Sequence, residues 1–254
     1  MMGGSSTKAS SAEDKQDIAA LRFALDNGIN VIDTAEMYAN GHSEEVVGQA
    51  INGYDREELF IITKVLPRHL KYDDLIKAAR GSLARLGCGY IDLYLIHWLI
   101  RGSNVEEAIS AMEYLVDEGL VGHIGVSNFE VPDMTRAIAA AKKQKIIANE
   151  IEYNLFEKSP EKEIIPFCEK NKIVPIAYTP LSKGTLGRGR IEDIEEVKAM
   201  AKRTGKTPVQ IALSYLAKRS LPIPKSSNIE HIKEIIGAMG WELSNEDYEL
   251  LKSI

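Results

Sequence analysis

The chain has 254 residues, of which 44% are hydrophobic and 27% charged, a composition typical of a folded protein with a packed core rather than of a disordered chain. Its net charge of -6 argues against a nucleic-acid surface, and no apolar run approaches the ~20 residues of a membrane-spanning helix. The amino-terminal segment lacks the apolar core of a signal peptide, and Cys88 and Cys168 have no metal-ligand spacing. We therefore expect a protein of the reducing cytoplasm, with no nucleic-acid or membrane partner.

Apolar runs and amphipathic stretches alternate along the chain. The apolar runs are mostly continuous, which is typical of parallel strands covered by helices. Helix signals include Ser43 as an N-cap, Pro132 in a first turn, and Thr207 as an N-cap before Pro208. Strands are predicted at 30–35, 59–65, 90–98, 121–128, 145–154, 173–180 and 221–226, and helices at 12–27, 43–52, 72–86, 104–118, 131–143, 160–171, 191–204, 208–219, 228–238 and from Ser244 onward.

Repeated strand–helix units of this size predict an α/β fold, either a doubly wound sheet or a (β/α)₈ TIM barrel. The barrel is favoured because polar residues follow successive strands along the series, instead of gathering at one switch point. We expect a single domain over residues 1–254, with residues 1–11 flexible. The first barrel strand is not evident, so the barrel is expected to be truncated at the amino terminus, or to use the MMGGSST segment as a poor strand.

Three successive strands end on a polar residue: Asp33, Lys64 and His97. Tyr38 stands in the loop after the first of them. Singly, each has a structural explanation, as a helix cap, a core histidine or a packing tyrosine. Together they point to a site, because a core has no need of an acid, an ammonium and an imidazole on neighbouring strands, and buried charges are costly unless paired.

These four groups suit carbonyl reduction. A phenol has a reference pKa of ~10, and a nearby ammonium lowers that pKa by favouring the phenolate. Asp33 would hold Lys64 charged, Tyr38 would donate a proton to the developing alkoxide, and neutral His97 would bind the carbonyl oxygen. The hydride must come from a cofactor, since no side chain supplies one.

The segments DTAEMY, IITK, LIHW, GVSNF, AYTPLSKG and IPKSSNIEHIKEI, in this order, resemble the aldo-keto reductase family, from about Ala20 to Ser253. The resemblance implies an NADP(H)-dependent oxidoreductase that reduces an aldehyde or ketone. It makes Asp33, Tyr38, Lys64 and His97 the catalytic tetrad, with Tyr38 as general acid, and Trp98 a substrate-pocket aromatic. The implied cofactor-binding residues are Ser127 and Asn128 at the carboxamide, Tyr178 stacked on the nicotinamide, Leu181, Ser182 and Gly184 at the pyrophosphate, and Lys225, Ser226, Asn228, His231 and Glu234 around the adenosine and its 2′-phosphate.

The chain departs from the family pattern at several positions. Glu150 stands where the family usually has glutamine at the carboxamide, and its charge should favour oxidised cofactor. His231 replaces an arginine and Ile235 an asparagine near the adenine, while Lys225 keeps NADPH preferred over NADH. The long carboxy-terminal substrate loop is missing and the loop after His97 is short, which suggests broad or small carbonyl substrates.

Two other functions stay open at this stage. One is a cofactor-binding barrel with weak or no catalysis, acting as a sensor or partner module. The other is a Schiff-base aldolase built on Lys64, against which the adjacent Asp33 argues because it keeps the amine protonated. A homo-oligomer is also left open.

Overall fold

The computed structural model describes residues 11–182 and 190–254. The chain forms two compact units, Met1–Asn149 and Glu150–Ile254. Predictions for residues 1–10, including the MMGGSST segment, and for Gly184 lie outside the described residues. The single domain over 1–254 stays a prediction.

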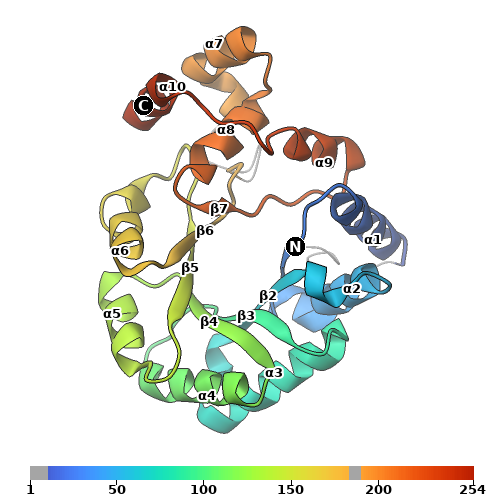
Figure 1. Cartoon of the computed structure of the whole chain (residues 1–254), viewed down its shortest axis with the longest axis vertical. Coiled ribbons are helices and arrows are strands. Elements are labelled where there is room, and N and C mark those ends of the chain that lie inside the picture. Colours follow the sequence, from blue (N-terminus) through green and yellow to red (C-terminus); the bar gives the residue numbers. More distant parts are fainter. Residues whose placement is uncertain (1–10, 183–189) are drawn as a thin grey trace. The chain divides into compact units, whose positions relative to one another are not determined.

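The first unit alternates strands and helices, as predicted (Figure 1). Strand β5 runs across the boundary between the two units. The elements are α1 (Ser11–Asp26), β1 (Val31–Asp33), α2 (His42–Ile51), β2 (Phe60–Val65), α3 (Tyr72–Leu86), β3 (Ile91–Ile96), α4 (Val105–Asp117), β4 (Val121–Ser127), α5 (Val131–Ala140) and β5 (Ile146–Glu152), with 3₁₀ turns at Tyr38–Gly41, Arg56–Glu58 and Pro67–His69.

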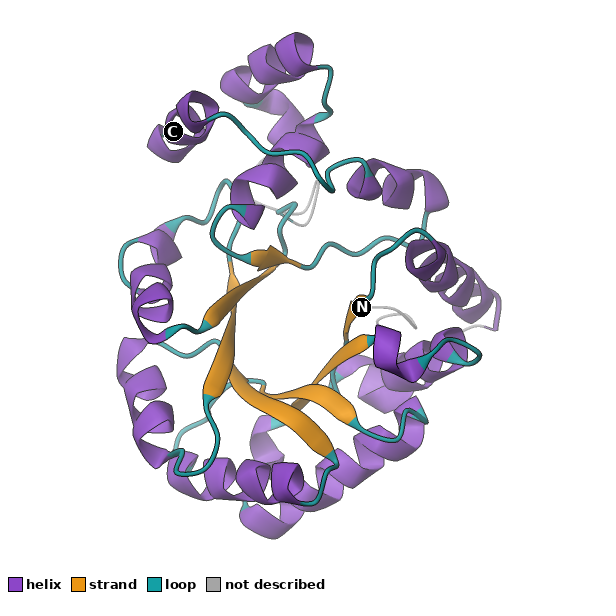
Figure 2. Ribbon diagram, viewed as in Figure 1, coloured by secondary structure: helices purple, strands orange, loops and turns teal. Residues whose placement is uncertain are grey.

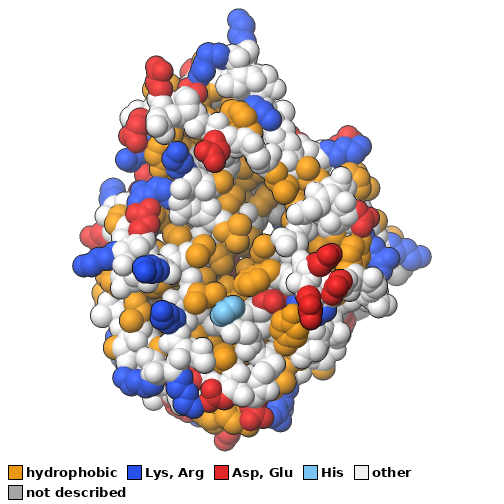
Figure 3. Space-filling view, viewed as in Figure 1, with side chains coloured by type: hydrophobic (Ala, Val, Ile, Leu, Met, Phe, Trp, Pro, Cys, Tyr) orange, Lys and Arg blue, Asp and Glu red, His pale blue; other side chains and the backbone are white. Residues whose placement is uncertain are grey.

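Strands β1, β2, β3 and β4 pair in parallel in this order. Helices α1 to α5 pack against one another in sequence, and Figure 2 shows α3 and α4 along one side of these strands. The interior is aliphatic: Ile61, Ile62, Leu93 and Leu95 are at most 2% exposed. Figure 3 shows charged side chains of both signs over α3 and α4, on the solvated face of these helices. A parallel sheet covered in this way directs the carboxyl ends of β1 to β4 to one edge.

The second unit contains the parallel pair β6–β7, with Ile176 opposite Leu221. Its core includes Tyr153 and Tyr215, whose hydroxyls both donate to one oxygen of Glu161. The elements are α6 (Ile164–Asn171), β6 (Val174–Tyr178), α7 (Glu195–Thr204), α8 (Pro208–Ala217), β7 (Leu221–Pro222), α9 (Ile229–Ile236) and α10 (Asn245–Ser253), with 3₁₀ turns at Ser159–Glu161 and Ile191–Asp193.

The predicted strands are confirmed, each slightly shorter than its apolar run. The last shrinks to Leu221–Pro222, because prolines cannot donate a ladder hydrogen bond. Thr207 caps α8 in a capping box with Gln210, as predicted. Ser43 as the N-cap of the second helix was wrong: α2 starts at His42 and its N-cap is Gly41, because the turn that precedes it ends in the left-handed conformation.

Two predictions concern the protein's environment. Within the described residues, no helix has both the length and the apolarity to cross a membrane. Cys88 and Cys168 are both buried free thiols. The cytoplasmic location stays a prediction.

Candidate active site

The first unit brings the four predicted catalytic residues to one edge of its sheet. Asp33 is the last residue of β1, Lys64 lies one residue before the end of β2, and His97 directly follows β3. Tyr38 opens the 3₁₀ turn after β1. Because the strands are parallel neighbours, their carboxyl ends place these side chains together, at the edge where active sites of barrel folds lie.

Lys64 is fully buried and is paired with Asp33. Its Nζ donates to Oδ1 and Oδ2 of Asp33, at 2.6 Å each, and to the carbonyl oxygen of Thr34 at 3.0 Å. The side chain of Lys64 is 0% exposed and that of Asp33 10%. A buried ammonium is tolerated only with such partners. Asp33 and the carbonyl of Thr34 therefore stabilise the positive charge of Lys64 near the carboxyl end of β2.

Tyr38 lies beside this ammonium and beside His97. The Nζ of Lys64 is 5.2 Å from the centroid of the Tyr38 ring, within the range of a cation–π contact. The rings of Tyr38 and His97 meet edge to face, with centroids 5.7 Å apart. The phenol, the ammonium, the carboxylate and the imidazole therefore form one cluster, as the sequence predicted.

His97 is neutral at physiological pH. Burial, and secondarily the charge of Lys64, lower the pKa of His97 from 6.5 to about 3. Among the described residues, its buried Nδ1 has no hydrogen-bond partner. The ring of Trp98 packs against that of His97, with centroids 4.3 Å apart, which places the predicted substrate-pocket aromatic next to the tetrad.

Ser127 and Asn128 lie at the end of β4, beside His97. Ser127 is buried, and Asn128 adopts a left-handed φ of 58°. The Nδ2 of Asn128 donates to the carbonyl oxygen of His97 at 3.1 Å and to Ser127 Oγ at 3.0 Å. The backbone turn thus orients an amide and a hydroxyl next to the imidazole of His97.

The second unit carries the other predicted cofactor residues. Glu150, on β5, is 2% exposed, and Tyr178 ends β6 half-buried. Burial, followed by the charges of Glu152 and Glu150, raises the pKa of Tyr178. After β6, Ser182 is buried with a φ of 55°, and Leu181 packs against the core of this unit.

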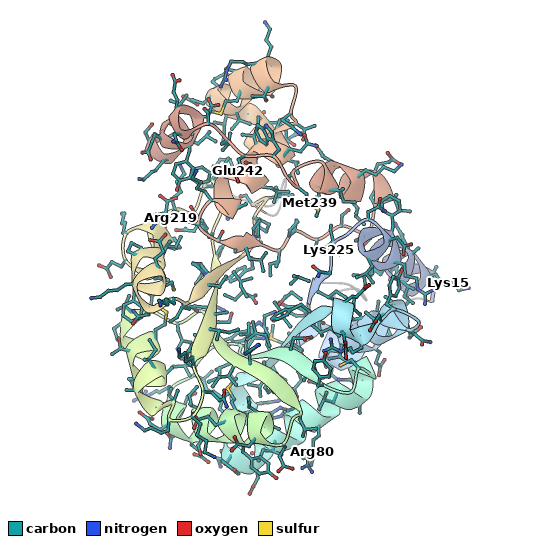
Figure 4. The ribbon with its side chains drawn as sticks, viewed as in Figure 1. Lys15, Arg80, Arg219, Lys225, Met239 and Glu242 are labelled. Carbon is teal, nitrogen blue, oxygen red and sulfur yellow. The ribbon has the colours of Figure 1, made fainter. Side chains whose placement is uncertain are left out.

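The predicted phosphate residues surround the start of α9. Lys225, labelled in Figure 4 between β7 and α9, is exposed, and its Nζ donates to Ser227 Oγ. Ser226 Oγ accepts from the backbone N–H of Asn228 at 3.0 Å. The N-cap is Asn228, whose side chain accepts from the N–H of Glu230. His231 is exposed on α9, and Glu234 is partly buried there.

Each unit, taken by itself, carries groups that match one part of a nicotinamide dinucleotide. The amide of Asn128 and the hydroxyl of Ser127 match the hydrogen-bonding groups of a carboxamide, and Lys225 with Ser226 at a helix N-terminus matches a phosphate. In the second unit, Thr179 Oγ1 is buried between Tyr178 and Ser182, and no partner for it occurs among the described residues. Such a hydroxyl is a ready donor for a ligand oxygen. The individual binding roles stay predictions.

Sequence reasoning missed the buried carboxylate of Glu44. It is 0% exposed, accepts from Thr63 Oγ1 at 2.6 Å and pairs with Arg85 Nε at 2.6 Å. A signal was available, because Glu44, Val47 and Ile51 share one face of α2 by helical spacing, and the latter two are apolar. A charge on the apolar stripe of a helix predicts a buried ion pair.

Comparison with known proteins decides the family. The model of the aldo/keto reductase family matches residues 1–254. The chain belongs to the aldo/keto reductase family. It is 33% identical over 244 residues to the methylglyoxal reductase YeaE of Escherichia coli (strain K12), a match that covers 94% of this chain and 84% of YeaE.

Solved aldo-keto reductases share the fold. The thermostable aldo-keto reductase Tm1743, crystallised with the inhibitor epalrestat, superposes with a TM-score of 0.92 at 37% identity, over 99% of this chain and 91% of that one. The Klebsiella pneumoniae aldo/keto reductase, crystallised with NADP and acetate, gives a TM-score of 0.89 at 35% identity, over 98% of this chain and 89% of that one. The predicted fold class, an α/β barrel of which seven parallel strands are present in the described residues, is confirmed.

Proposed function

We propose that this aldo-keto reductase reduces small aldehydes or ketones to alcohols with NADPH, and that Tyr38 is the general acid. The observation that carries the proposal is the position of Lys64, whose buried ammonium lies 5.2 Å from the Tyr38 ring and is held by both oxygens of Asp33. A positive charge held in this position stabilises the phenolate that remains when Tyr38 donates its proton.

The chemistry needs one hydride and one proton for each carbonyl. The nicotinamide cofactor, when bound, supplies the hydride to the carbonyl carbon. Tyr38 gives its hydroxyl proton to the carbonyl oxygen as negative charge develops there. Lys64 stabilises the phenolate that remains, and Asp33 keeps Lys64 charged and in place. Tyr38 regains a proton from solvent before the next cycle.

His97 acts as a neutral hydrogen-bond donor to the carbonyl oxygen. A histidine with a pKa of about 3 carries one N–H and no charge at neutral pH. It therefore polarises the carbonyl without competing with Tyr38 as the acid. Trp98, packed edge to face against the His97 ring, limits the space beside it.

We assign the cofactor residues as the sequence suggests. Ser127 and Asn128 bind the nicotinamide carboxamide, and Lys225 with Ser226 binds the 2′-phosphate, which favours NADPH over NADH. The crystallised Klebsiella pneumoniae relative, which holds NADP, supports this choice. The exposed His231 contributes less than an arginine would, because a neutral imidazole is a weaker phosphate partner.

We assign small carbonyl compounds as the substrate class. The similarity to a methylglyoxal reductase supports this. Exposed apolar side chains are also present in the loops that follow β1 and β3: Met37, beside Tyr38, is 38% exposed, and Ile100 is 49% exposed. The similarity to a methylglyoxal reductase makes methylglyoxal the first compound to test.

The test is NADPH consumption with methylglyoxal and a series of simple aldehydes and ketones, for the wild type and for Tyr38→Phe. We expect wild-type turnover and a loss of at least about 10²-fold in the variant. NADPH affinity, followed by fluorescence, should stay within about twofold because the phenol hydroxyl only donates to substrate. Full turnover by Tyr38→Phe would refute its role. NADPH binding without turnover across the series would favour a cofactor-binding module instead.

The pairing of Lys64 counts against Schiff-base chemistry. An aldolase lysine must be a free amine when it attacks a carbonyl. Two carboxylate oxygens at 2.6 Å from the Nζ of Lys64 favour the ammonium. Borohydride reduction in the presence of substrate should therefore leave no adduct on Lys64.

A further inference from the structure

The turn that carries Tyr38 has an unusual backbone. The three residues after Tyr38 all have positive φ angles: 48° at Ala39, 55° at Asn40 and 91° at Gly41. The left-handed region is unfavourable for a residue with a Cβ, so Ala39 and Asn40 keep it only if the surrounding structure imposes it. The conformation beside the catalytic tyrosine must therefore be held by neighbouring groups.

Arg85 is the neighbour that holds the end of this turn. Gly41 is buried, and a Cβ built on it would lie 2.8 Å from both Cδ and Nε of Arg85 and 3.2 Å from its Cζ. The guanidinium end of Arg85, which comes from α3, thus packs directly on the Gly41 backbone.

Glu44 fixes the position of Arg85. Its carboxylate is completely buried, and Oε2 accepts from Arg85 Nε at 2.6 Å. Arg85 also donates from Nη2 to Ser82 Oγ at 3.2 Å. Because the carboxylate of Glu44 is excluded from water, movement of the guanidinium away from it would leave a buried negative charge without a partner. Arg85 is therefore held against Gly41 and is not a mobile surface side chain.

The other oxygen of Glu44 connects to the strand that bears Lys64. Oε1 accepts from Thr63 Oγ1 at 2.6 Å, and Thr63 is 0% exposed. Thr63 directly precedes Lys64 on β2, and side chains alternate along a strand, so Thr63 points to α2 while Lys64 points to Asp33. One carboxylate thus joins the strand of Lys64 to the arginine that packs on the turn of Tyr38.

We propose that Glu44 is a positioning residue, which acts through Arg85 and Thr63 to fix the Tyr38 turn relative to the Lys64 ammonium. The proposal rests on the proposed function, in which proton donation depends on that geometry. Glu44 does not touch the reacting groups. It determines where the phenol lies with respect to the charge that assists it, so its loss should affect the chemical step more than the binding of ligands.

The first test compares Glu44→Gln with Asp92→Asn. Asp92 is a matched control, since its carboxylate also accepts from an arginine, Arg56, and from a group on β2, the N–H of Ile61. It lies near the amino end of β3, however, away from the tetrad at the carboxyl ends. We expect kcat to fall about 10- to 100-fold in Glu44→Gln, with KM and NADPH affinity within about twofold, and kcat to be unchanged in folded Asp92→Asn.

A second variant separates positioning from loss of folding. Glu44→Leu combined with Arg85→Met removes both charges and leaves no unpaired buried ion, so it should melt closer to the wild type than Glu44→Gln does. Its kcat should stay low, because nothing then holds the Tyr38 turn. Recovery of wild-type kcat in this double variant, or an equal loss of kcat in Asp92→Asn, would overturn the proposal.

A measurement that needs no turnover distinguishes failure of this proposal from failure of the proposed function. Hydrogen exchange of peptides over residues 36–43 should become faster in Glu44→Gln and in the double variant, and stay as in the wild type in Asp92→Asn. This holds whether or not the wild type reduces any of the compounds tried. Unchanged exchange over 36–43 in Glu44→Gln would overturn the proposal.

Discussion

The Nζ of Lys64 lies 2.6 Å from each carboxylate oxygen of Asp33, although 31 positions separate the two residues in the chain. Both side chains are almost excluded from water. In such surroundings the partners depend on each other, because either charge alone would carry a large desolvation cost. The same pair sets the charge beside Tyr38. Variants of these two residues can therefore separate the pair's contribution to folding stability from its proposed contribution to catalysis.

Asp33→Asn should reduce both stability and activity. It leaves the Lys64 ammonium buried with a weaker partner, and we expect a loss of about 3–5 kcal/mol in the free energy of unfolding, measured by urea denaturation. Asp33→Leu combined with Lys64→Met should restore most of that stability but remain inactive. Glu169→Gln, which breaks the more exposed pair with Arg219, is the control and should cost less than about 1 kcal/mol. Activity in the double variant would contradict the role of Lys64.

His97 should make the protein less stable as the pH falls. Its folded pKa is about 3 and its ordinary value 6.5, so between these values the unfolded chain binds a proton that the folded chain does not. The contribution of neutral His97 to the free energy of unfolding is thus fully present above pH 6.5 and is lost as the pH falls toward about 3.

The measurement is the free energy of unfolding against pH, for the wild type and for His97→Gln. The wild type should lose up to about 1.4 kcal/mol more per pH unit than the variant in this range. The control is His123→Gln, at an exposed position on β4, which should keep the wild-type slope. Parallel curves for the wild type and His97→Gln would show that His97 is not buried as a neutral group.

Glu150→Gln should change the preference between the two redox states of the cofactor. The buried carboxylate places negative charge near Tyr178, which is assigned to the nicotinamide, and so favours the positively charged oxidised ring. Removing the charge should tighten NADPH relative to NADP⁺ by about tenfold, corresponding to ~1.4 kcal/mol. Binding of each form is measured by calorimetry. Glu163→Gln, at an exposed position directly before α6 whose charge is not among those acting on Tyr178, is the control. An equal change for both cofactor forms would refute the electrostatic explanation.

Gly41→Ala should be more destabilising than Gly28→Ala. Both glycines have left-handed φ angles, 91° and 88°, and in this conformation a Cβ costs about 1–2 kcal/mol. A Cβ at Gly28 meets nothing within 4 Å, whereas at Gly41 it meets Arg85, which Glu44 holds in place. We expect an added cost of about 1–3 kcal/mol at Gly41 from this overlap. Equal melting temperatures for the two variants would show that Arg85 can move away freely.

The order of strands and helices was predictable because it depends on local patterns. Continuous apolar runs, proline in first turns and the Thr207 cap each act within a few residues, and the structure confirms them. The family followed from short motifs at strand ends, which the sequence displays directly. Ser43 was misjudged as a cap because the left-handed conformation of Gly41, the N-cap of α2, has no distinct sequence signal.

The sequence alone determined the fold class, the family and the identity of the four groups at the strand ends, because each is encoded in residue type and short-range spacing. Only the tertiary structure decided which charges are buried together. The pair of Lys64 with Asp33, the low pKa of His97, and the link from Glu44 to Arg85 and Thr63 depend on segments brought together by strand pairing and helix packing. The physical reason is that desolvation and ion pairing depend on distance in space, and local sequence patterns do not contain that distance.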